Sequence, residues 1–153
     1  MTTARSAQDV FQMAIDMEQV GRDFYVALAM GSDNTSVRTF CARLAKEEEA
    51  HLATFKNLRS KWEKAVAASR PGPQAAEALA ELVKSQVQPD PREVQKVAIG
   101  GKLADAVAMA IQMEQDSINF YQGMIANLPD SAQAIQAIIE QERKHLVGLK
   151  SVM

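Results

Sequence analysis

The sequence predicts an all-α protein, a bundle of four long helices made of two tandem helical hairpins with one long crossover connection. Three observations predict it. First, the 7 glycines and 5 prolines of the 153 residues cluster at a few points, and the helix-favouring Ala, Leu, Glu, Gln, Lys and Met dominate between them. Second, apolar residues recur at alternating steps of three and four, the spacing of a buried helix face in a bundle. Third, the chain repeats itself, because eight of the thirteen residues at 13–25 return at 109–121.

Length and composition are typical of a water-soluble protein with a single domain over 1–153. Hydrophobic residues make up 47% of the chain and charged residues 24%. A net charge of -2 leaves no basic surface for nucleic acid, so no nucleic-acid partner is expected. The first residues lack the apolar run of a signal peptide, and no apolar stretch is long enough for a membrane span. The lone Cys41 precludes an intrachain disulfide, and we expect a cytoplasmic protein with no membrane partner.

The first hairpin is expected over 7–68. Its first helix covers about 7–30, and the residues on its buried face form a line that we call a seam: Phe11, Ala14, Glu18, Gly21, Tyr25 and Leu28. After a short turn with candidate N-caps at 33–36, a second helix is expected over about 36–68. Its seam contains Cys41, Leu44, Glu48, His51, Phe55, Leu58, Trp62 and Ala65. The short turn makes the two helices antiparallel neighbours.

Residues 69–101 are expected to connect the two hairpins. Proline-rich sequences at 71–73 and 89–91 end or interrupt helices. A helix is predicted between them over 74–87, and a further turn or two over 94–99. The connection carries no chemical motif, so its expected role is to carry the chain from one hairpin to the next.

The second hairpin is expected over 102–153. Its first helix covers about 102–127 and matches the first helix of the chain position by position, with a seam of Val107, Ala110, Glu114, Ser117, Tyr121 and Met124. The last helix follows Pro129, with Asp130 or Ser131 as its cap. Its seam contains Ile135, Ile138, Glu142, His145, Leu149 and Val152.

Polar residues interrupt all four apolar seams near the middle of the helices: Glu18, Glu48, His51, Glu114, Glu142 and His145. Four buried carboxylates require neutralisation by protons, buried cations or metal ions. No lysine or arginine lies on a seam, whereas two divalent ions would balance four carboxylates and two neutral imidazoles. Each Glu-x-x-His pair projects from one helix face, and a set so rich in oxygen favours iron or manganese over structural zinc. The alternative is a duplicated bundle that has kept this sequence and binds no metal.

The chain resembles the rubrerythrin-like branch of the ferritin-like superfamily of di-iron carboxylate proteins. The resemblance lies in Ala-Ile-Asp-Met-Glu-Gln at 14–19 followed by Phe24-Tyr25, in Lys-Glu-Glu-Glu-Ala-His-Leu at 46–52, and in their second copies. It implies a ferritin-like four-helix bundle with two Fe ions, for which Mn or Zn can substitute. It also implies that the four glutamates are metal ligands, two of them bridging, that His51 and His145 each cap one metal, and that all six residues act in catalysis through the metals.

Two features depart from the family pattern. Typical rubrerythrins carry a rubredoxin domain whose paired cysteines hold a mononuclear iron, whereas this chain has only Cys41. Rubrerythrins also commonly carry an extra glutamate three residues after the ligand of the third long helix, and here that position is Ser117, with Gly21 as its repeat mate. The predicted site is therefore closer to a plain six-ligand pattern. These small residues either leave space for O2, peroxide or solvent, or let helices approach, and the sequence favours neither.

Other side chains on or near the seams receive supporting roles. Tyr25 and Tyr121 are expected to hydrogen-bond a ligand carboxylate on a neighbouring helix, with a backbone carbonyl as the alternative partner. Cys41 is expected to be a buried structural thiol. Glu47 and Glu49, on either side of the proposed ligand between them, are expected to face water. Core packing is expected for one tryptophan and four methionines: Trp62, Met13, Met17, Met109 and Met113.

These assignments lead to one main functional hypothesis and two alternatives. The main hypothesis is a di-iron oxidoreductase of rubrerythrin type that reacts with hydrogen peroxide or O2, a chemistry of oxidative stress, and receives electrons from an external donor such as a rubredoxin-like protein. The alternatives are a ferroxidase or iron-binding protein for iron handling without peroxidase turnover, and a structural bundle without metal. Each hairpin holds half of the ligands, so a homodimer in which two chains exchange hairpins fits the sequence as well as a closed monomer does.

Overall fold

The computed structural model describes residues 3–64, 72–86 and 88–152, for residues 3–6 without their side chains. The regular structure of this part is all helical and includes no strand, which confirms the predicted all-α class. The four long helices are α1 (Thr3–Gly31), α2 (Thr35–Lys64), α5 (Leu103–Asn127) and α6 (Ala132–Val152). Two shorter helices, α3 (Pro73–Ser85) and α4 (Pro91–Gly100), lie between α2 and α5 in the sequence, and a 3-10 turn, η2 (Pro129–Ser131), precedes α6. None of these helices combines the length and the apolar character that a membrane span requires.

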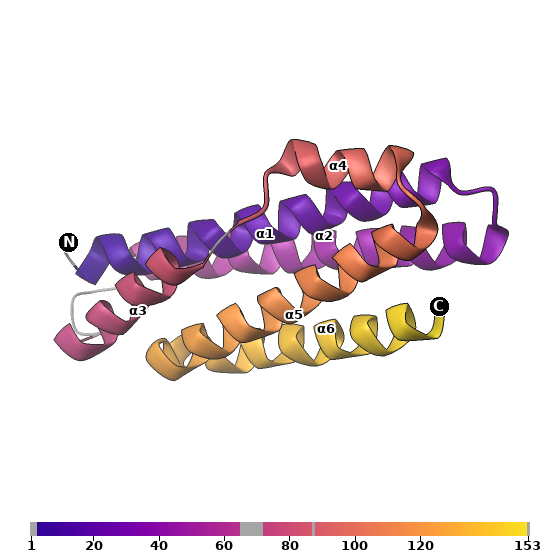
Figure 1. Cartoon of the computed structure of the whole chain (residues 1–153). Coiled ribbons are helices and arrows are strands. Elements are labelled where there is room, and N and C mark those ends of the chain that lie inside the picture. The colour runs from indigo at the N-terminus through magenta and orange to yellow at the C-terminus, as the bar shows by residue number, and fades with distance from the viewer. Residues whose placement is uncertain (1–2, 65–71, 87, 153) are drawn as a thin grey trace.

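The four long helices form the bundle that the two repeats predict. Helix α1 packs along α2, helix α5 packs along α6, and the two pairs meet through contacts of α1 with α5 and of α2 with α6 (Figure 1). Each pair is joined by a short turn, so its members run in opposite directions. The arrangement is that of a ferritin-like bundle with one long connection between its halves.

The connection between the halves covers one side of the bundle. Helices α3 and α4 both contact α1 and α5, and Figure 1 shows them along different parts of α1. They bury Leu79 of α3 and Val94 of α4. Only a turn or two was expected in the second of these segments, but α4 has ten residues, because Pro91 occupies its first turn and the Asp90 side chain accepts a hydrogen bond from the Arg92 amide. Helix α3 ends at Ser85, before the expected interruption at 89–91. Proline at a helix start has no amide hydrogen to leave unpaired, so Pro91 also starts the next helix.

The turns within the halves differ from each other. Asn34 accepts a hydrogen bond from the Val37 amide through its side-chain oxygen at 3.1 Å, and so provides the cap predicted for the second helix. The last helix begins directly after Ser131, and both predicted cap residues, Asp130 and Ser131, lie in the 3-10 turn η2. The predicted end of the second helix at 68, the proline break at 71 and the seam residue 65 lie outside the described residues.

The apolar core consists of two clusters that lie on either side of the polar seam positions. One cluster contains Phe11, Phe55, Tyr121 and Ile135, and the other contains Phe24, Tyr25, Leu44, Val107 and Leu149. Along each long helix, the polar seam residues lie between the members of the first cluster and those of the second. The bundle is therefore apolar towards both ends and polar in the middle.

Candidate metal centre

The polar layer in the middle of the bundle is formed by the six residues singled out in the sequence. All are buried, with exposed fractions of 1–4%: Glu18, Glu48, His51, Glu114, Glu142 and His145. Helices α1 and α5 contribute one glutamate each, and α2 and α6 contribute one Glu-x-x-His pair each. The layer thus reproduces the duplication of the sequence in space.

The six side chains form two overlapping groups of four. Within each group, the ligand atoms all lie within 4.8 Å of one another. One group contains Glu18 and His51, and the other contains Glu114 and His145. Two residues belong to both groups, Glu48 and Glu142, which we call the shared glutamates. We call Glu18 and Glu114 the terminal glutamates. A carboxylate that reaches two ion positions is the geometry required of a bridging ligand.

Both imidazoles direct the same nitrogen into the layer. The Nδ1 atom of His51 lies 2.8 Å from Glu142 Oε1 and 3.5 Å from Glu18 Oε2. The Nδ1 atom of His145 lies 3.1 Å from Glu142 Oε2 and 3.2 Å from Glu48 Oε1. The two rings are stacked with their centroids 6.0 Å apart. Each Nδ1 atom is therefore the nitrogen available to an ion, and each Nε2 atom faces out of the layer.

The outward Nε2 atoms contact residues that the sequence did not single out as partners. His51 Nε2 contacts the Gln141 side-chain oxygen, and His145 Nε2 lies 2.5 Å from Glu47 Oε2. Glu47 keeps 39% of its side-chain surface exposed, as expected, and the contact with His145 is an addition that the sequence did not predict. Glu49 is exposed, as expected. The signal for this contact is weak in the sequence, because Glu47 and Gln141 lie off the seams, among ordinary surface residues.

The two buried tyrosines cross between the halves of the bundle. Tyr25 on α1 donates a hydrogen bond to Glu114 Oε1 at 2.6 Å, and Tyr121 on α5 donates to Glu18 Oε1 at 2.6 Å. Burial and the nearby carboxylates raise the pKa of both hydroxyls well above the usual value, so both stay protonated donors. Each terminal glutamate thus accepts a hydrogen bond from a tyrosine of the opposite half. This confirms the expected carboxylate partner, and not a backbone carbonyl, for both hydroxyls.

Without a metal ion, the layer neutralises itself with protons. Burial and repulsion between carboxylates raise the pKa of both shared glutamates well above the usual range. Burial also raises the pKa of the terminal glutamates, but hydrogen bonds from the shared glutamates and the imidazoles outweigh it, so the net shift is downward. Burial lowers the pKa of both imidazoles, but the facing carboxylates outweigh it and the pKa is raised. In the metal-free layer these shifts favour protons on the imidazoles and on the shared glutamates, and their direction offsets the negative charge of the terminal glutamates.

The residues present also fit two divalent cations. In the described part of the chain, every ion pair of the four buried glutamates is to a histidine and none is to lysine or arginine. Several buried ligand atoms have close contacts only with one another across the layer and none with hydrogen-bond geometry: Glu18 Oε2, His51 Nδ1 and both Glu142 oxygens. Buried polar atoms without a hydrogen bond are costly unless another ligand satisfies them. Four carboxylates and two neutral imidazoles form an oxygen-rich set of the kind that hard and borderline divalent metals prefer.

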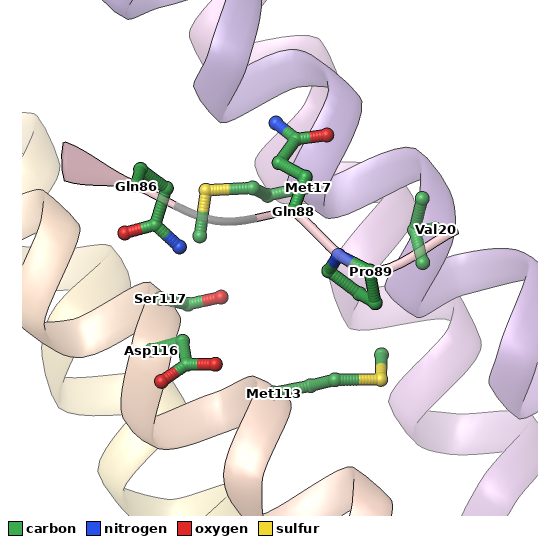
Figure 2. A pocket seen from close by; sticks show the side chains of 8 residues that line it. All are labelled: Met17, Val20, Gln86, Gln88, Pro89, Met113, Asp116 and Ser117. Carbon is green, nitrogen blue, oxygen red and sulfur yellow. The ribbon is translucent and has the colours of Figure 1, made fainter. Parts of the chain in front are cut away.

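The surroundings of the layer differ between its two halves. A Cβ atom placed on Gly21 would lie 3.6 Å from Glu48 Cδ, an ordinary contact, so there is room for a methyl group beside Glu48 and close packing does not require a glycine here. Its repeat mate Ser117 borders a small pocket instead, and Figure 2 shows it facing Met17 and Met113 there. The pocket lies between α1, α5 and the segment that joins α3 to α4 (Figure 2). Ser117 thus borders open space, but none of the six residues of the polar layer lines this pocket, so the expectation of open space at the metals stays a prediction.

The remaining seam residues have the structural surroundings expected of them. Cys41 is 3% exposed, and burial raises the pKa of its thiol to about 11, which suppresses the reactive thiolate. Trp62 is buried in the same apolar cluster as Phe55. The four methionines are partly buried against the two clusters: Met13, Met17, Met109 and Met113. None of these residues belongs to either candidate ligand group.

Comparison with known proteins places this geometry in a family. No curated protein and no solved structure gave a match to the chain. The family model described as Rubrerythrin matches residues 9–153, which include all four long helices except the start of α1, and all six residues of the polar layer. Because that match covers nearly the whole chain, the protein belongs to the rubrerythrin family.

Proposed function

We propose that this protein is a di-iron carboxylate oxidoreductase of rubrerythrin type that reacts with hydrogen peroxide or O2. The observation that carries the proposal is the pair of overlapping ligand groups that share Glu48 and Glu142. Two neighbouring cations held by common carboxylates can exchange two electrons with one small oxidant. The family match supports iron as the metal, with Mn or Zn as substitutes.

Each residue of the layer receives a defined role in this proposal. Glu18 and His51 would hold one ion and Glu114 and His145 the other, with both shared glutamates as bridges. These residues would hold two Fe(II) ions, which would supply the two electrons that, with two protons, convert one hydrogen peroxide to two molecules of water. The neutral Nδ1 atoms give nitrogen ligands, so both imidazoles must lose a proton before an ion binds.

The residues around the layer position the ligands and exclude water. Tyr25 and Tyr121 each use one hydrogen bond to fix the orientation of a terminal glutamate, which leaves the other oxygen of that carboxylate for an ion. The apolar clusters on both sides of the layer shield it from bulk water, which strengthens interactions between the ions and the carboxylates. The pocket beside Ser117 is the proposed approach for the small oxidant (Figure 2).

The proposed partners of this reaction include an electron donor. Cys41 is the one cysteine of these 153 residues and cannot alone form a paired-cysteine iron site, so we assign electron delivery to a donor outside this domain, such as a rubredoxin-like protein. We further propose a cytoplasmic homodimer. One chain contains both ligand groups, and two chains that exchange hairpins through 69–101 would form the same groups twice. Light scattering of the protein, alone and mixed with a variant of different mass, tests this assembly.

Rapid mixing of the reduced protein with oxidant tests the main proposal. Protein loaded anaerobically with two equivalents of Fe(II) is mixed with hydrogen peroxide, and oxidation is followed by absorbance. We expect oxidation to be much faster than that of free Fe(II) in the same buffer. Glu48→Gln should remove this acceleration, whereas Glu49→Gln, which changes the same charge on an exposed neighbour, should retain it. An oxidation rate equal to that of free Fe(II) would refute the proposal.

Iron handling without peroxidase turnover is the second candidate, and one observation favours it. The position of the extra glutamate common in rubrerythrins holds Ser117, which offers no carboxylate to an ion. A ferroxidase would oxidise added Fe(II) with O2 and retain more than two iron ions per chain if its assembly forms a shell. The main proposal instead requires repeated turnover when a reductant and peroxide are both supplied. Iron analysis after oxidation, together with a turnover assay, separates the two.

A further inference from the structure

The two imidazoles of the polar layer have chemically different partners on their outer side. His145 Nε2 contacts a carboxylate oxygen of Glu47, whereas His51 Nε2 contacts the amide oxygen of Gln141. Glu47 and Gln141 precede Glu48 and Glu142, so they occupy the same position in the two repeats. At this position the first repeat has an anionic acceptor, Glu47, and the second has a neutral acceptor of the same shape, Gln141.

We propose that Glu47 and Gln141 are positioning residues that make the two metal positions unequal, so that the position at His145 binds a divalent cation more tightly than the position at His51. The inference rests on the proposed metal centre. Both acceptors fix the ring so that Nε2 carries the hydrogen and Nδ1 faces the layer. Only the carboxylate adds a negative charge, which makes Nδ1 a stronger donor to a cation.

The rest of the layer offers both positions the same ligands. Each receives one terminal glutamate, one imidazole and both shared glutamates, and each terminal glutamate has a tyrosine hydrogen bond of 2.6 Å. The repeats also differ beside the layer at Gly21 against Ser117, but neither of these residues carries a charge. Among the side chains that contact an imidazole of the layer, the outer partners Glu47 and Gln141 are the pair that differs in charge between the repeats.

The location of these two residues allows such a difference without loss of stability. Glu47 keeps 39% of its side chain exposed, and Gln141 is exposed. Both line a surface hollow between α2 and α6 together with Arg43 and Lys144, with His145 also in its lining. A carboxylate in this hollow remains hydrated while it contacts the imidazole, so its charge carries little of the penalty of full burial. The same exposure makes exchanges between Glu and Gln here compatible with folding.

Calorimetric titration of the metal-free protein with Co²⁺ tests the inference through its two dissociation constants. In Glu47→Gln, the tighter constant should weaken by about 10- to 100-fold, the range for loss of an outer partner of a metal-bound histidine. In Gln141→Glu, the weaker constant should become tighter, and the two constants should approach each other. Repulsion between two neighbouring cations separates the constants in every variant, so the comparison is made between variants.

Two further variants control the experiment. The double exchange Glu47→Gln/Gln141→Glu should restore the separation between the constants, because one imidazole again has a carboxylate partner. Glu49→Gln removes one charge from the neighbouring exposed position and should leave both constants within about twofold, as expected for surface changes. Circular dichroism verifies that each variant is folded.

The failure of this inference is distinguishable from failure of the metal centre. Two Co²⁺ ions bound with constants that Glu47→Gln leaves unchanged would overturn the inequality and leave the centre in place. An equal effect of Glu49→Gln would also overturn it, because long-range charge and not the contact would then be responsible. No binding of Co²⁺ by the unaltered protein would overturn both proposals.

Discussion

Binding of metal to the polar layer should release protons, and the number of protons can be predicted from the structure. Four groups have a raised pKa in the metal-free protein: Glu48, Glu142, His51 and His145. At pH 6 we expect each to hold a proton, and each must lose it before two ions occupy the layer. Two divalent cations would then replace four protons, and the layer stays neutral. The overall binding constant should therefore rise by about 10,000-fold per pH unit, or about 5 kcal/mol, while all four groups remain protonated in the free protein.

The proton release is measured directly by titration with Co²⁺ or Mn²⁺ in a weakly buffered solution with a pH indicator. Close to four protons per two ions at pH 6 is the expected result, and the number should fall as the pH approaches the raised values. Metal affinity should rise with pH because the pKa values of these groups are raised. A group that holds its proton more strongly competes better with a cation at low pH. Fewer than two protons would refute the reasoning, because even the imidazoles alone would then fail to release theirs. Equal release by Glu142→Gln and by the unaltered protein would also contradict it.

Four further predictions concern single side chains. Glu142→Gln should raise the Tm of the metal-free protein at pH 8 by roughly 2–8 °C, because it removes about 1–2 kcal/mol of the cost of burying an ionisable group. The same variant should abolish most of the Tm increase caused by Co²⁺, and Glu49→Gln is the neutral control. Tyr121→Phe should lower the Tm of the metal-free protein, because it removes a hydrogen bond, worth about 1–3 kcal/mol, to a buried carboxylate. It should also weaken Co²⁺ binding in calorimetry. An unchanged affinity would argue against a positioning role for Tyr121. Cys41 should resist iodoacetamide at pH 8 in the native protein and react after unfolding, as followed by mass spectrometry. Gly21→Ala should stabilise α1 by about 0.5–1 kcal/mol in thermal unfolding without loss of Co²⁺ binding, and loss of binding would show that Glu48 must move towards this glycine.

The bundle and the polar layer were predictable because both depend on burial along helices. A residue such as Glu18 is conspicuous only because the positions three or four residues away from it are apolar. The repeat then predicted that its counterpart Glu114 would occupy the same depth in the other half, and the structure places both in one layer. The crossed tyrosine contacts followed from the same seams, since Tyr25 and Tyr121 lie two turns beyond the terminal glutamates.

The contacts missed by sequence reasoning lie where burial is incomplete. Glu47 and Gln141 are off the seams, and nothing in the periodicity separates a surface glutamate from one that contacts an imidazole on another helix. Their contacts depend on how α2 and α6 approach each other, which is a property of the assembled bundle. The length of α4 was missed for another reason, because a proline ends a helix from within but starts one at its first turn.

The charge balance of the layer has a consequence for the choice between enzyme and iron handling. Small zinc domains unfold without metal because no other force holds their ligands together. Here two apolar clusters enclose the layer, and the raised pKa values of the shared glutamates and the imidazoles favour protons that offset its charge when metal is absent. The bundle is therefore expected to remain folded as ions enter and leave, with only its stability changing by the free energy of binding. Persistence of the fold after metal removal is then common to a peroxidase and to an iron-handling protein, so thermal unfolding cannot separate them. The two functions differ in the fate of the iron after oxidation. In a peroxidase the same two ions return to Fe(II) through an external donor, whereas in an iron-handling protein they leave the layer.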